Sequence, residues 1–236
     1  MALATGALMS ASARAAEEVD LELVLAADGS GSIDDEELRL QREGYARAVA
    51  HPRVLLAIGS GFLGKIAIAY MEWGAPESQH TIVDWTIIEG PESAADFGKK
   101  LVAAPRAAFG FNSISNAIVY SQNLMETNDY AGLRRIIDVS ADAGNIGGIP
   151  LSMARTRALS AGITINGLAI SRPGSTRPFR GVSLEAHLAA EVVGGPGAFV
   201  VTIDETLSFA DAVIKKLVLE IAGTAQPPVQ LGELSQ

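Results

Sequence analysis

The sequence predicts an α/β fold: a doubly wound, mostly parallel six-stranded sheet with helices on both faces and one antiparallel edge strand. Apolar, β-branched runs alternate with segments of helical periodicity along most of the chain, which is typical of this class. No internal repeat or linker-like change in composition divides the chain. Its 236 residues, 48% of them hydrophobic, suffice for one core. We therefore expect a single domain over residues 19–223.

The first half of this domain opens with a buried strand. Val19–Ala27 is rich in Val and Leu and stops at a glycine-rich loop, and Asp34–Ala50 then has helical periodicity with acids at its start. Two segments alternate like strands, and the short Gly74-Ala75-Pro76 connection between them predicts an antiparallel pair; they are Lys65–Trp73 and His80–Ile88. The helices that follow are Pro91–Val102 and Ser113–Glu126.

The second half continues the same alternation. Its predicted strands are Leu133–Val139, Ile163–Ile170 and Ala198–Ile203. Its predicted helices are Pro150–Ser160, which a proline opens, Leu184–Val193, and the amphipathic Asp204–Ala222. Because strand and helix alternate, the connections are expected to be parallel crossovers that place helices on both faces of the sheet.

The two ends of the chain differ from the domain. Residues 1–16 are small and apolar, and Ala11-Ser12-Ala13 fits the small-x-small pattern of a secretory cleavage site. They predict a signal-peptide remnant and a periplasmic or secreted protein; the alternative is a disordered leader on a cytoplasmic one. Residues 224–236 contain Pro227-Pro228 and little apolar periodicity, which predicts a flexible tail.

Composition excludes several classes of function. The formal net charge of −9 disfavours binding to nucleic acid or anionic membranes, because like charges repel. The sequence has no cysteine, which excludes disulfides, thiol catalysis and cysteine-bound metals. Its 3 histidines are scattered, so a histidine-rich metal site is not expected. Oxygen atoms therefore remain as the candidate ligands for a metal ion.

Two aspartates far apart in the sequence are predicted to meet. In an open sheet of order 3-2-1-4-5-6, ligands bind beyond the carboxyl ends of the first and fourth strands, where the strand order reverses. Asp28 follows the first predicted strand and Asp142 follows the fourth. The other candidate ligands are neutral: Ser30, Ser32, Asn112 and Ser113. Such hard oxygen donors suit Mg²⁺, with Mn²⁺ or Ca²⁺ as alternatives.

These residues resemble the metal-ion-dependent adhesion site (MIDAS) of von Willebrand factor type A (vWA) domains. Asp28-x-Ser30-x-Ser32 is similar to the first metal loop, Asn112-Ser113 to the second and Asp142 to the third. Three further segments resemble an uncharacterised bacterial branch of vWA-like proteins: Gln41–Tyr45, Arg134–Ser140 and Gly194–Phe199.

The resemblance implies a Rossmann-like vWA fold and metal-dependent protein recognition, in which a partner's Asp or Glu carboxylate completes the coordination of the metal. Asn112 stands where the family has a threonine, so a degenerate site on an interaction scaffold is one alternative. The other is a metal-assisted hydrolase or phosphoryl-transfer enzyme. Such an enzyme needs a general base, and no histidine lies in the three loops, so we predict no catalysis.

Several residues have simpler interpretations. Ser32 could cap the helix that follows it, and the acids at 34–37 suit the helix dipole better than a calcium site. Asp138 is predicted to be a satisfied, partly buried acid within its strand, and not a metal ligand. The loop Ser171–Val182 carries Arg172, Arg177 and Arg180, which either attract acidic partners or are simply solvated.

A glycine-rich segment partly matches the sequence motifs of phosphate-binding loops. Gly59–Lys65 (GSGFLGK) matches Gly-x-Gly-x-x-Gly and part of the Gly-x-x-x-x-Gly-Lys pattern. Both motifs need a strand before them and a helix after them. Val54–Ile58 is short enough to be that strand, but Ile66–Trp73 alternates like a strand and does not open a helix. We therefore expect no nucleotide site here.

Overall fold

The computed structural model describes residues 15–170, 181–203 and 208–223. Its strands are β1 (Glu17–Val19), β2 (Leu21–Asp28), β3 (Ile66–Trp73), β4 (Gln79–Ile88), β5 (Tyr130–Gly132), β6 (Arg135–Ala141), β7 (Thr164–Ile170) and β8 (Val200–Ile203). Its helices are α1 (Asp35–Val49), α2 (Pro52–Gly59), α3 (Pro91–Ala103), α4 (Ile114–Glu126), α5 (Leu151–Ser160), α6 (Leu184–His187) and α7 (Phe209–Ala222). None of the helices in these ranges is both long enough and apolar enough to cross a bilayer.

The main sheet has the predicted topology. Its six strands run in the order β4-β3-β2-β6-β7-β8, and every neighbouring pair is parallel except the antiparallel β3–β4 pair. Counted along the chain, this is the expected order 3-2-1-4-5-6, with the first and fourth strands, β2 and β6, side by side. β1 and β5 form an additional two-stranded parallel ribbon that the sequence did not predict.

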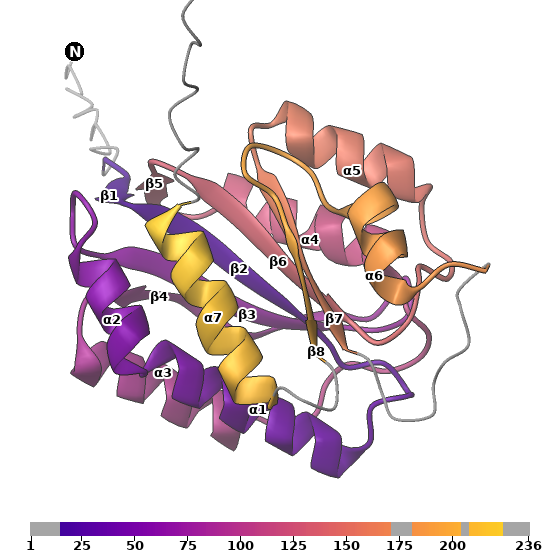
Figure 1. The fold of residues 1–236 in the computed structure, drawn as a ribbon, viewed down its shortest axis with the longest axis horizontal. Coiled ribbons are helices and arrows are strands. Elements are labelled where there is room, and N and C mark those ends of the chain that lie inside the picture. The colour runs from indigo at the N-terminus through magenta and orange to yellow at the C-terminus, as the bar shows by residue number, and fades with distance from the viewer. Residues whose placement is uncertain (1–14, 171–180, 204–207, 224–236) are drawn as a thin grey trace, which may run out of the picture.

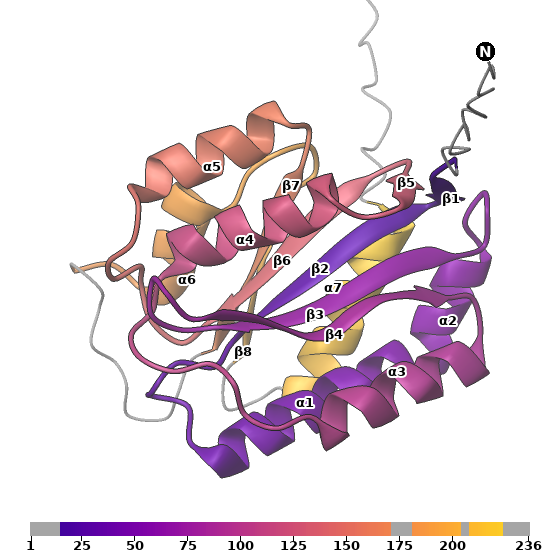
Figure 2. The ribbon, with the colours of Figure 1, turned by 180° about the vertical axis from the view of Figure 1, so that it is seen from behind.

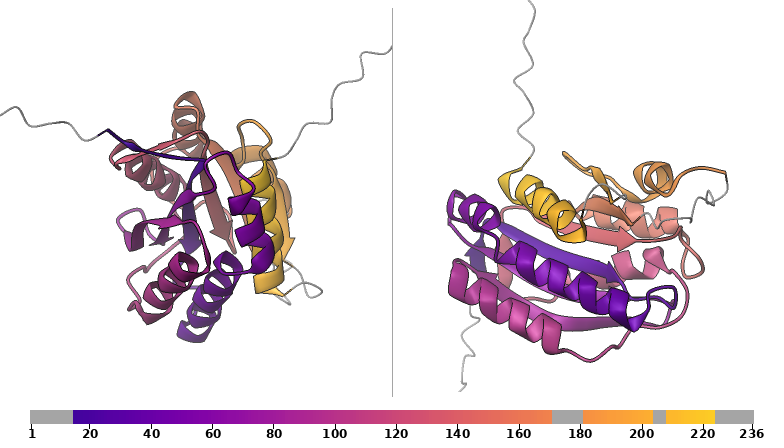
Figure 3. Two further views of the ribbon diagram at one scale, coloured as in Figure 1. Left: turned by 90° about the vertical axis from the view of Figure 1, so that its left-hand side faces the viewer. Right: turned by 60° about the horizontal axis from the view of Figure 1, so that its bottom comes forward.

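Helices cover both faces of the sheet (Figures 1 and 2). Helices α1, α2, α3 and α7 pack on one face, where Tyr45, Phe97 and Leu217 belong to a buried core shared with β2 and β3. Helices α4 and α5 pack on the other face, with Ile118 and Ala158 in a second buried core. The two layers of helices are seen end-on in Figure 3. Both cores keep the sheet rigid and fix where its strands end.

The structure differs from two of the interpretations made from the sequence. Val54–Ile58 lies within α2 and is helical, because Pro52 at the first turn and the His51 side chain, which accepts from the Arg53 N–H, start a helix. The predicted helix Leu184–Val193 divides into the short α6 and a π-helical turn, Leu188–Val192. Residues 204–207 of the predicted last helix, and residues 171–180 of the arginine loop, lie outside the described residues.

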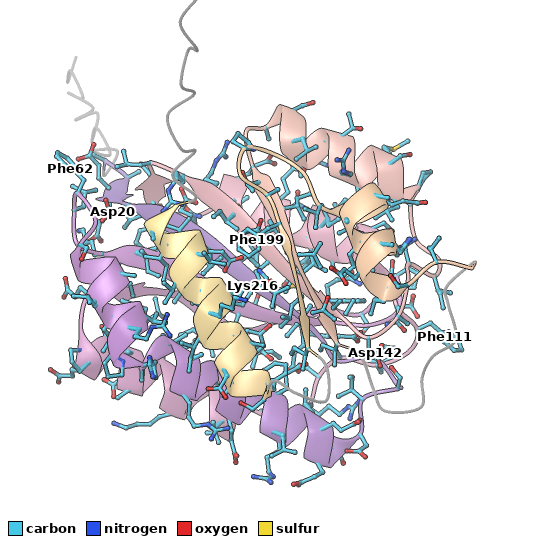
Figure 4. The ribbon with its side chains drawn as sticks, in the orientation of Figure 1. Asp20, Phe62, Phe111, Asp142, Phe199 and Lys216 are labelled. Atoms are coloured by element: carbon cyan, nitrogen blue, oxygen red, sulfur yellow. The ribbon has the colours of Figure 1, made fainter. Side chains whose placement is uncertain are left out.

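The glycine-rich segment Gly59–Lys65 binds a carboxylate of the protein itself. Both oxygens of Asp20 accept from the Leu63 N–H, at 2.9 and 3.0 Å. A Cβ at Gly61 would lie 2.4 Å from Asp20 Oδ2, so glycine is required there. A helix precedes the loop and β3 follows it, the reverse of the phosphate-binding arrangement. Phe62 at its tip is 90% exposed (Figure 4).

A buried ion cluster joins α7 to the sheet. Lys216 Nζ lies 2.7 Å from Asp138 Oδ1, contacts Glu220 and stands 5.3 Å from the centre of the Phe199 ring (Figure 4). Asn166 Nδ2 donates to Glu220 Oε1 at 2.9 Å. Burial raises the pKa of Asp138, and burial together with the charge of Asp138 raises the pKa of Glu220 to about 7. Asp138 is thus a paired acid within its strand, and it is buried more completely than the sequence predicted.

Candidate metal centre

Three loops meet at the carboxyl edge of the sheet. Asp28 ends β2, Asp142 follows β6 directly, and Asn112 lies just before α4. The Asn112 amide joins the two acids, because its Nδ2 donates to Asp28 Oδ2 at 3.0 Å and to Asp142 Oδ1 at 3.1 Å. Figure 4 shows Asp142 at the end of the molecule opposite to Asp20 and Phe62. The sheet topology therefore brings together residues that lie 114 positions apart.

Asp28 is fully buried, and the hydrogen bonds it accepts from described residues come from neutral groups. Its Oδ1 accepts from the Ser30 N–H at 2.9 Å, and its Oδ2 accepts from the Asp142 N–H at 3.3 Å as well as from Asn112. Burial and the neighbouring charge of Asp142 raise the pKa of Asp28 to about 7, against the opposing effect of the Ser30 hydrogen bonds. A cation at this point would stabilise the ionised carboxylate.

Two hydroxyls connect the first loop to the third. Ser30 Oγ lies 3.0 Å from Ser32 Oγ, and Ser32 Oγ donates to Asp142 Oδ2 at 2.7 Å. Ser32 does not cap α1, because the cap is Asp34. Asp34 Oδ1 accepts from the Glu37 N–H at 2.8 Å, and the Asp34 N–H donates to Glu37 Oε2 at 2.9 Å. Ser32 is therefore available to the metal site.

Ser113 is the one predicted ligand outside this network. It precedes α4, and its buried Oγ has no hydrogen-bond partner among the described residues. The other five predicted ligands are linked by hydrogen bonds: Asp28, Ser30, Ser32, Asn112 and Asp142. Rotation of the Asn112 amide would put its carbonyl oxygen in place of its NH₂ group, and a carbonyl oxygen is a suitable ligand for a hard cation.

The donor set fits a small hard cation. It offers two carboxylates, hydroxyls and an amide, which is the chemistry that Mg²⁺ prefers. Two carboxylates balance a 2+ charge, and neutral donors for the other positions leave the ion able to accept a further anionic oxygen. Within the described ranges no cluster of three or more His, Cys, Asp or Glu offers a competing site.

Arg106 supports the first loop, a role that no sequence pattern indicated. Its Nη2 donates to the carbonyl oxygens of Gly29, Ser30 and Ile33, at 3.3, 3.1 and 2.8 Å. Its Nη1 pairs with Asp35 Oδ1 at 2.9 Å. Arg106 comes from the connection between α3 and α4, so no local pattern relates it to a loop more than 70 residues earlier. It holds the backbone that positions Ser30.

Replacing Arg106 with alanine is expected to weaken Mg²⁺ binding by about 10–100-fold, the usual cost of losing a residue that orients metal ligands. Arg106→Lys should restore part of the affinity, because one ammonium cannot reach all three carbonyls. Isothermal titration calorimetry measures this, with the exposed Arg53→Ala on α2 as the matched control. Equal affinities for Arg106→Ala and Arg53→Ala would contradict the supporting role.

Magnesium is expected to stabilise the protein more at pH 8 than at pH 6. The pKa of Asp28 rises from 3.8 to about 7 on folding, so the stability of the metal-free protein falls as the pH rises between these values. At pH 6 the metal must displace the proton that Asp28 holds, whereas at pH 8 the carboxylate is already free. When the Mg²⁺ concentration is 100 times Kd, the ion raises the free energy of unfolding at pH 8 by about 2.7 kcal/mol.

Thermal unfolding with excess MgCl₂ or EDTA at each pH measures this gain. Glu220 titrates in the same range, but it affects the samples with and without metal equally. The difference between the two therefore reports on the metal site. The same Mg²⁺ increment in unfolding temperature at both pH values would contradict the prediction.

Comparison with known proteins agrees with this fold. A family model described as "Protein of unknown function (DUF1194)" matches residues 18–225. No curated protein matches the sequence.

Solved structures with the vWA fold superpose on the chain. Proximal thread matrix protein 1 from the mussel byssus has a TM-score of 0.60 at 15% identity, over 87% of this chain and 48% of its own. The vWF domain of the type V pili tip protein Mfa5 from Porphyromonas gingivalis has a TM-score of 0.55 at 12% identity, over 94% of this chain and 99% of its own. The pilus adhesin SpaC from Lactobacillus rhamnosus GG has a TM-score of 0.58 at 12% identity, over 88% and 31%.

This chain thus spans less than half the length of the mussel protein and of SpaC. A further structure of the mussel protein carries zinc in its MIDAS motif, with a TM-score of 0.57 at 12% identity, over 86% of this chain and 45% of its own. At these identities the likeness establishes the fold, which is that of a vWA domain.

Proposed function

Because the chain belongs to the family of proteins of unknown function DUF1194, whose name assigns no activity, we propose a function from its own site. The protein is a recognition module that binds Mg²⁺ at the carboxyl edge of its sheet. Through that ion it binds an Asp or Glu carboxylate of a partner protein. One observation carries the proposal: Asp28 and Asp142 accept from the same nitrogen of Asn112, so both carboxylates face one point.

Each residue has a defined part in this proposal. Asp28, Ser30 and Ser32 contact the ion directly or through water, and Asp142 supplies the second negative charge. Asn112 or Ser113 stands in for the threonine of the family motif. The ion supplies an electrophilic centre for an anionic oxygen. The chain's own residues hold the two carboxylates at one point, and burial of Asp28 excludes water from part of the site.

The relatives support a metal and a binding role. The mussel protein has a zinc-occupied MIDAS motif, and SpaC is a pilus adhesin. We propose Mg²⁺ for this chain because the donors are all oxygen, with Mn²⁺ and Ca²⁺ as competing ions. We also propose a periplasmic or extracellular location, on the sequence pattern of residues 1–16.

Calorimetric titration of Mg²⁺ into wild type and Ser30→Ala tests the metal site. We expect wild type to bind one ion and Ser30→Ala to bind about tenfold more weakly, the effect of a lost orienting or ligating oxygen. Ser152→Ala, an exposed serine on α5, is the matched control. Binding of acetate, followed by NMR, should require Mg²⁺ and disappear with EDTA. A wild type that takes up no divalent ion would favour the degenerate scaffold instead.

The enzymatic alternative would require Asp28 or Asp142 to act both as a metal ligand and as the general base. His187 Nε2 accepts from the Asn145 backbone N–H at 3.5 Å and supports the loop after β6, and the His80 ring lies 6.4 Å from the Phe109 ring. A screen for hydrolysis of p-nitrophenyl phosphate and acetate with Mg²⁺ or Mn²⁺ separates the two functions. Turnover that is lost in Asp28→Ala would overturn the proposal of a pure binding module.

A further inference from the structure

Exposed apolar side chains lie on two of the loops that form the candidate metal centre. They come from the connection before α4 and from the loop after β6, and we call them the apolar rim: Phe109, Phe111, Ile146 and Ile149. Phe111 is 73% exposed, Phe109 54% and Ile146 45%. Large apolar side chains exposed together commonly mark a surface that another molecule covers.

Backbone hydrogen bonds join the rim to the metal site. Phe111 precedes Asn112, whose amide links the two carboxylates, and the Asn112 carbonyl oxygen accepts from the Ile146 N–H at 2.6 Å. The Phe109 carbonyl oxygen accepts from the Ala75 N–H at 2.8 Å, and its N–H donates to Ser78 Oγ at 3.0 Å. Figure 4 shows Phe111 at the same end of the molecule as Asp142. The rim is therefore held in place beside the site.

Neither the fold nor the metal accounts for this exposure. Polar side chains hold the backbone of the rim: Arg106 Nε donates to the Ala108 carbonyl oxygen at 3.5 Å, and Asn116 Oδ1 accepts from the Ile149 N–H at 3.1 Å. The apolar side chains stay outside both buried cores. A partner's carboxylate alone would not bury the apolar rim. Apolar groups on either side of that carboxylate would bury it and so add to the binding free energy.

We propose that the partner segment carries its acidic residue between aromatic or aliphatic residues, which cover the apolar rim while the carboxylate reaches the metal. This inference rests on the proposed function and specifies the chemistry of the partner. Aromatic anchors surrounding a polar contact are a common source of binding energy and specificity in protein interfaces. Phe111 is the central anchor, because it adjoins a metal-site residue directly.

Two blocked peptides test the inference: acetyl-Phe-Asp-Leu-amide and acetyl-Gly-Asp-Gly-amide. With Mg²⁺ present, we expect wild type to bind the apolar peptide about tenfold more tightly than the glycine peptide, which is the effect of burying part of one or two apolar side chains. Titrations are followed by ¹H–¹⁵N NMR on the full chain. Acetyl-Phe-Asn-Leu-amide, which lacks the carboxylate, should not bind whether Mg²⁺ is present or absent.

Phe111→Ser should remove the tenfold preference and leave Mg²⁺ affinity and binding of the glycine peptide unchanged. Phe62→Ser is the matched control, because Phe62 is also highly exposed but lies at the opposite end of the molecule. The Phe62→Ser variant should keep the tenfold preference of the wild type for the apolar peptide.

The outcomes separate this inference from the proposed function. If both peptides bind equally and only with Mg²⁺, the metal site stands and the apolar partner is wrong. If Mg²⁺ binds but neither peptide does, the inference is likewise wrong. If no Mg²⁺ binds, both proposals fail. A preference that survives in Phe111→Ser would also overturn the role of the rim.

Discussion

Replacing Lys216 with methionine is expected to lower the free energy of unfolding by about 3–5 kcal/mol at pH 8, the usual result of breaking a buried ion pair. Lys216 is fully buried between Asp138 and Glu220 and is the cation that those carboxylates contact. Methionine fills much of the same volume, so the loss comes from charge and not from a cavity. The variant leaves two buried carboxylates without their ammonium partner.

The loss should be smaller at pH 5.5 than at pH 8. Burial already raises the pKa of both acids in the wild type, so in the variant they take up protons readily and avoid buried charge at low pH. Urea unfolding followed by circular dichroism measures both values. Lys215→Met, one residue away on the exposed side of α7, is the matched control. Equal stability of the two variants at pH 8 would show that the cluster is not ionised as described.

Asp28→Asn is expected to weaken Mg²⁺ binding about 100-fold or more at pH 8, because affinity depends on the charge and number of the oxygen ligands. Asp28 supplies one of the two carboxylates of the site and is fully buried. An asparagine removes its charge and presents an NH₂ group on one side. Calorimetry measures the affinity, and far-ultraviolet circular dichroism establishes that the variant is folded.

Asp96→Asn is the control for this variant, because Asp96 is an exposed acid on α3 that pairs only with Lys99 among the described residues. It should bind Mg²⁺ like the wild type. The Mg²⁺-dependent rise in unfolding temperature should also disappear in Asp28→Asn and persist in Asp96→Asn. Wild-type affinity in Asp28→Asn would remove Asp28 from the site, and with it the central argument for metal binding.

The main sheet could be predicted because its pattern is local and strong. Buried, largely apolar strands such as β2 alternate with helices, and parallel crossovers then leave few possible strand orders. The α2 segment was ambiguous, since five apolar residues at Val54–Ile58 suit a strand or a helix equally. The signal that decides it is His51-Pro52, a cap followed by proline. β1 and β5 are 3 residues each, too short for any periodicity.

The candidate site was predictable as far as it depends on strand ends. Asp28 and Asp142 follow strands directly, so the topology placed them together. Arg106 and Lys216 were not predictable, because their partners lie on elements distant in sequence and their roles arise only from packing. Asn112 lies beside the two acids, and its amide link between the two carboxylates depends on side-chain rotation that no sequence pattern encodes.

The described chain enters at β1 and leaves after α7, at the end of the sheet opposite to Asp142 (Figures 1 and 4). Glu17 in β1 pairs with Lys65, and Arg134 before β6 donates to the last carbonyls of α7, so both points sit by the amino ends of the strands. A biotin or affinity tag joined directly to residue 15 or to residue 223 would therefore face the surface of a biosensor chip and leave Phe111 at the far end of the molecule, open to an injected ligand.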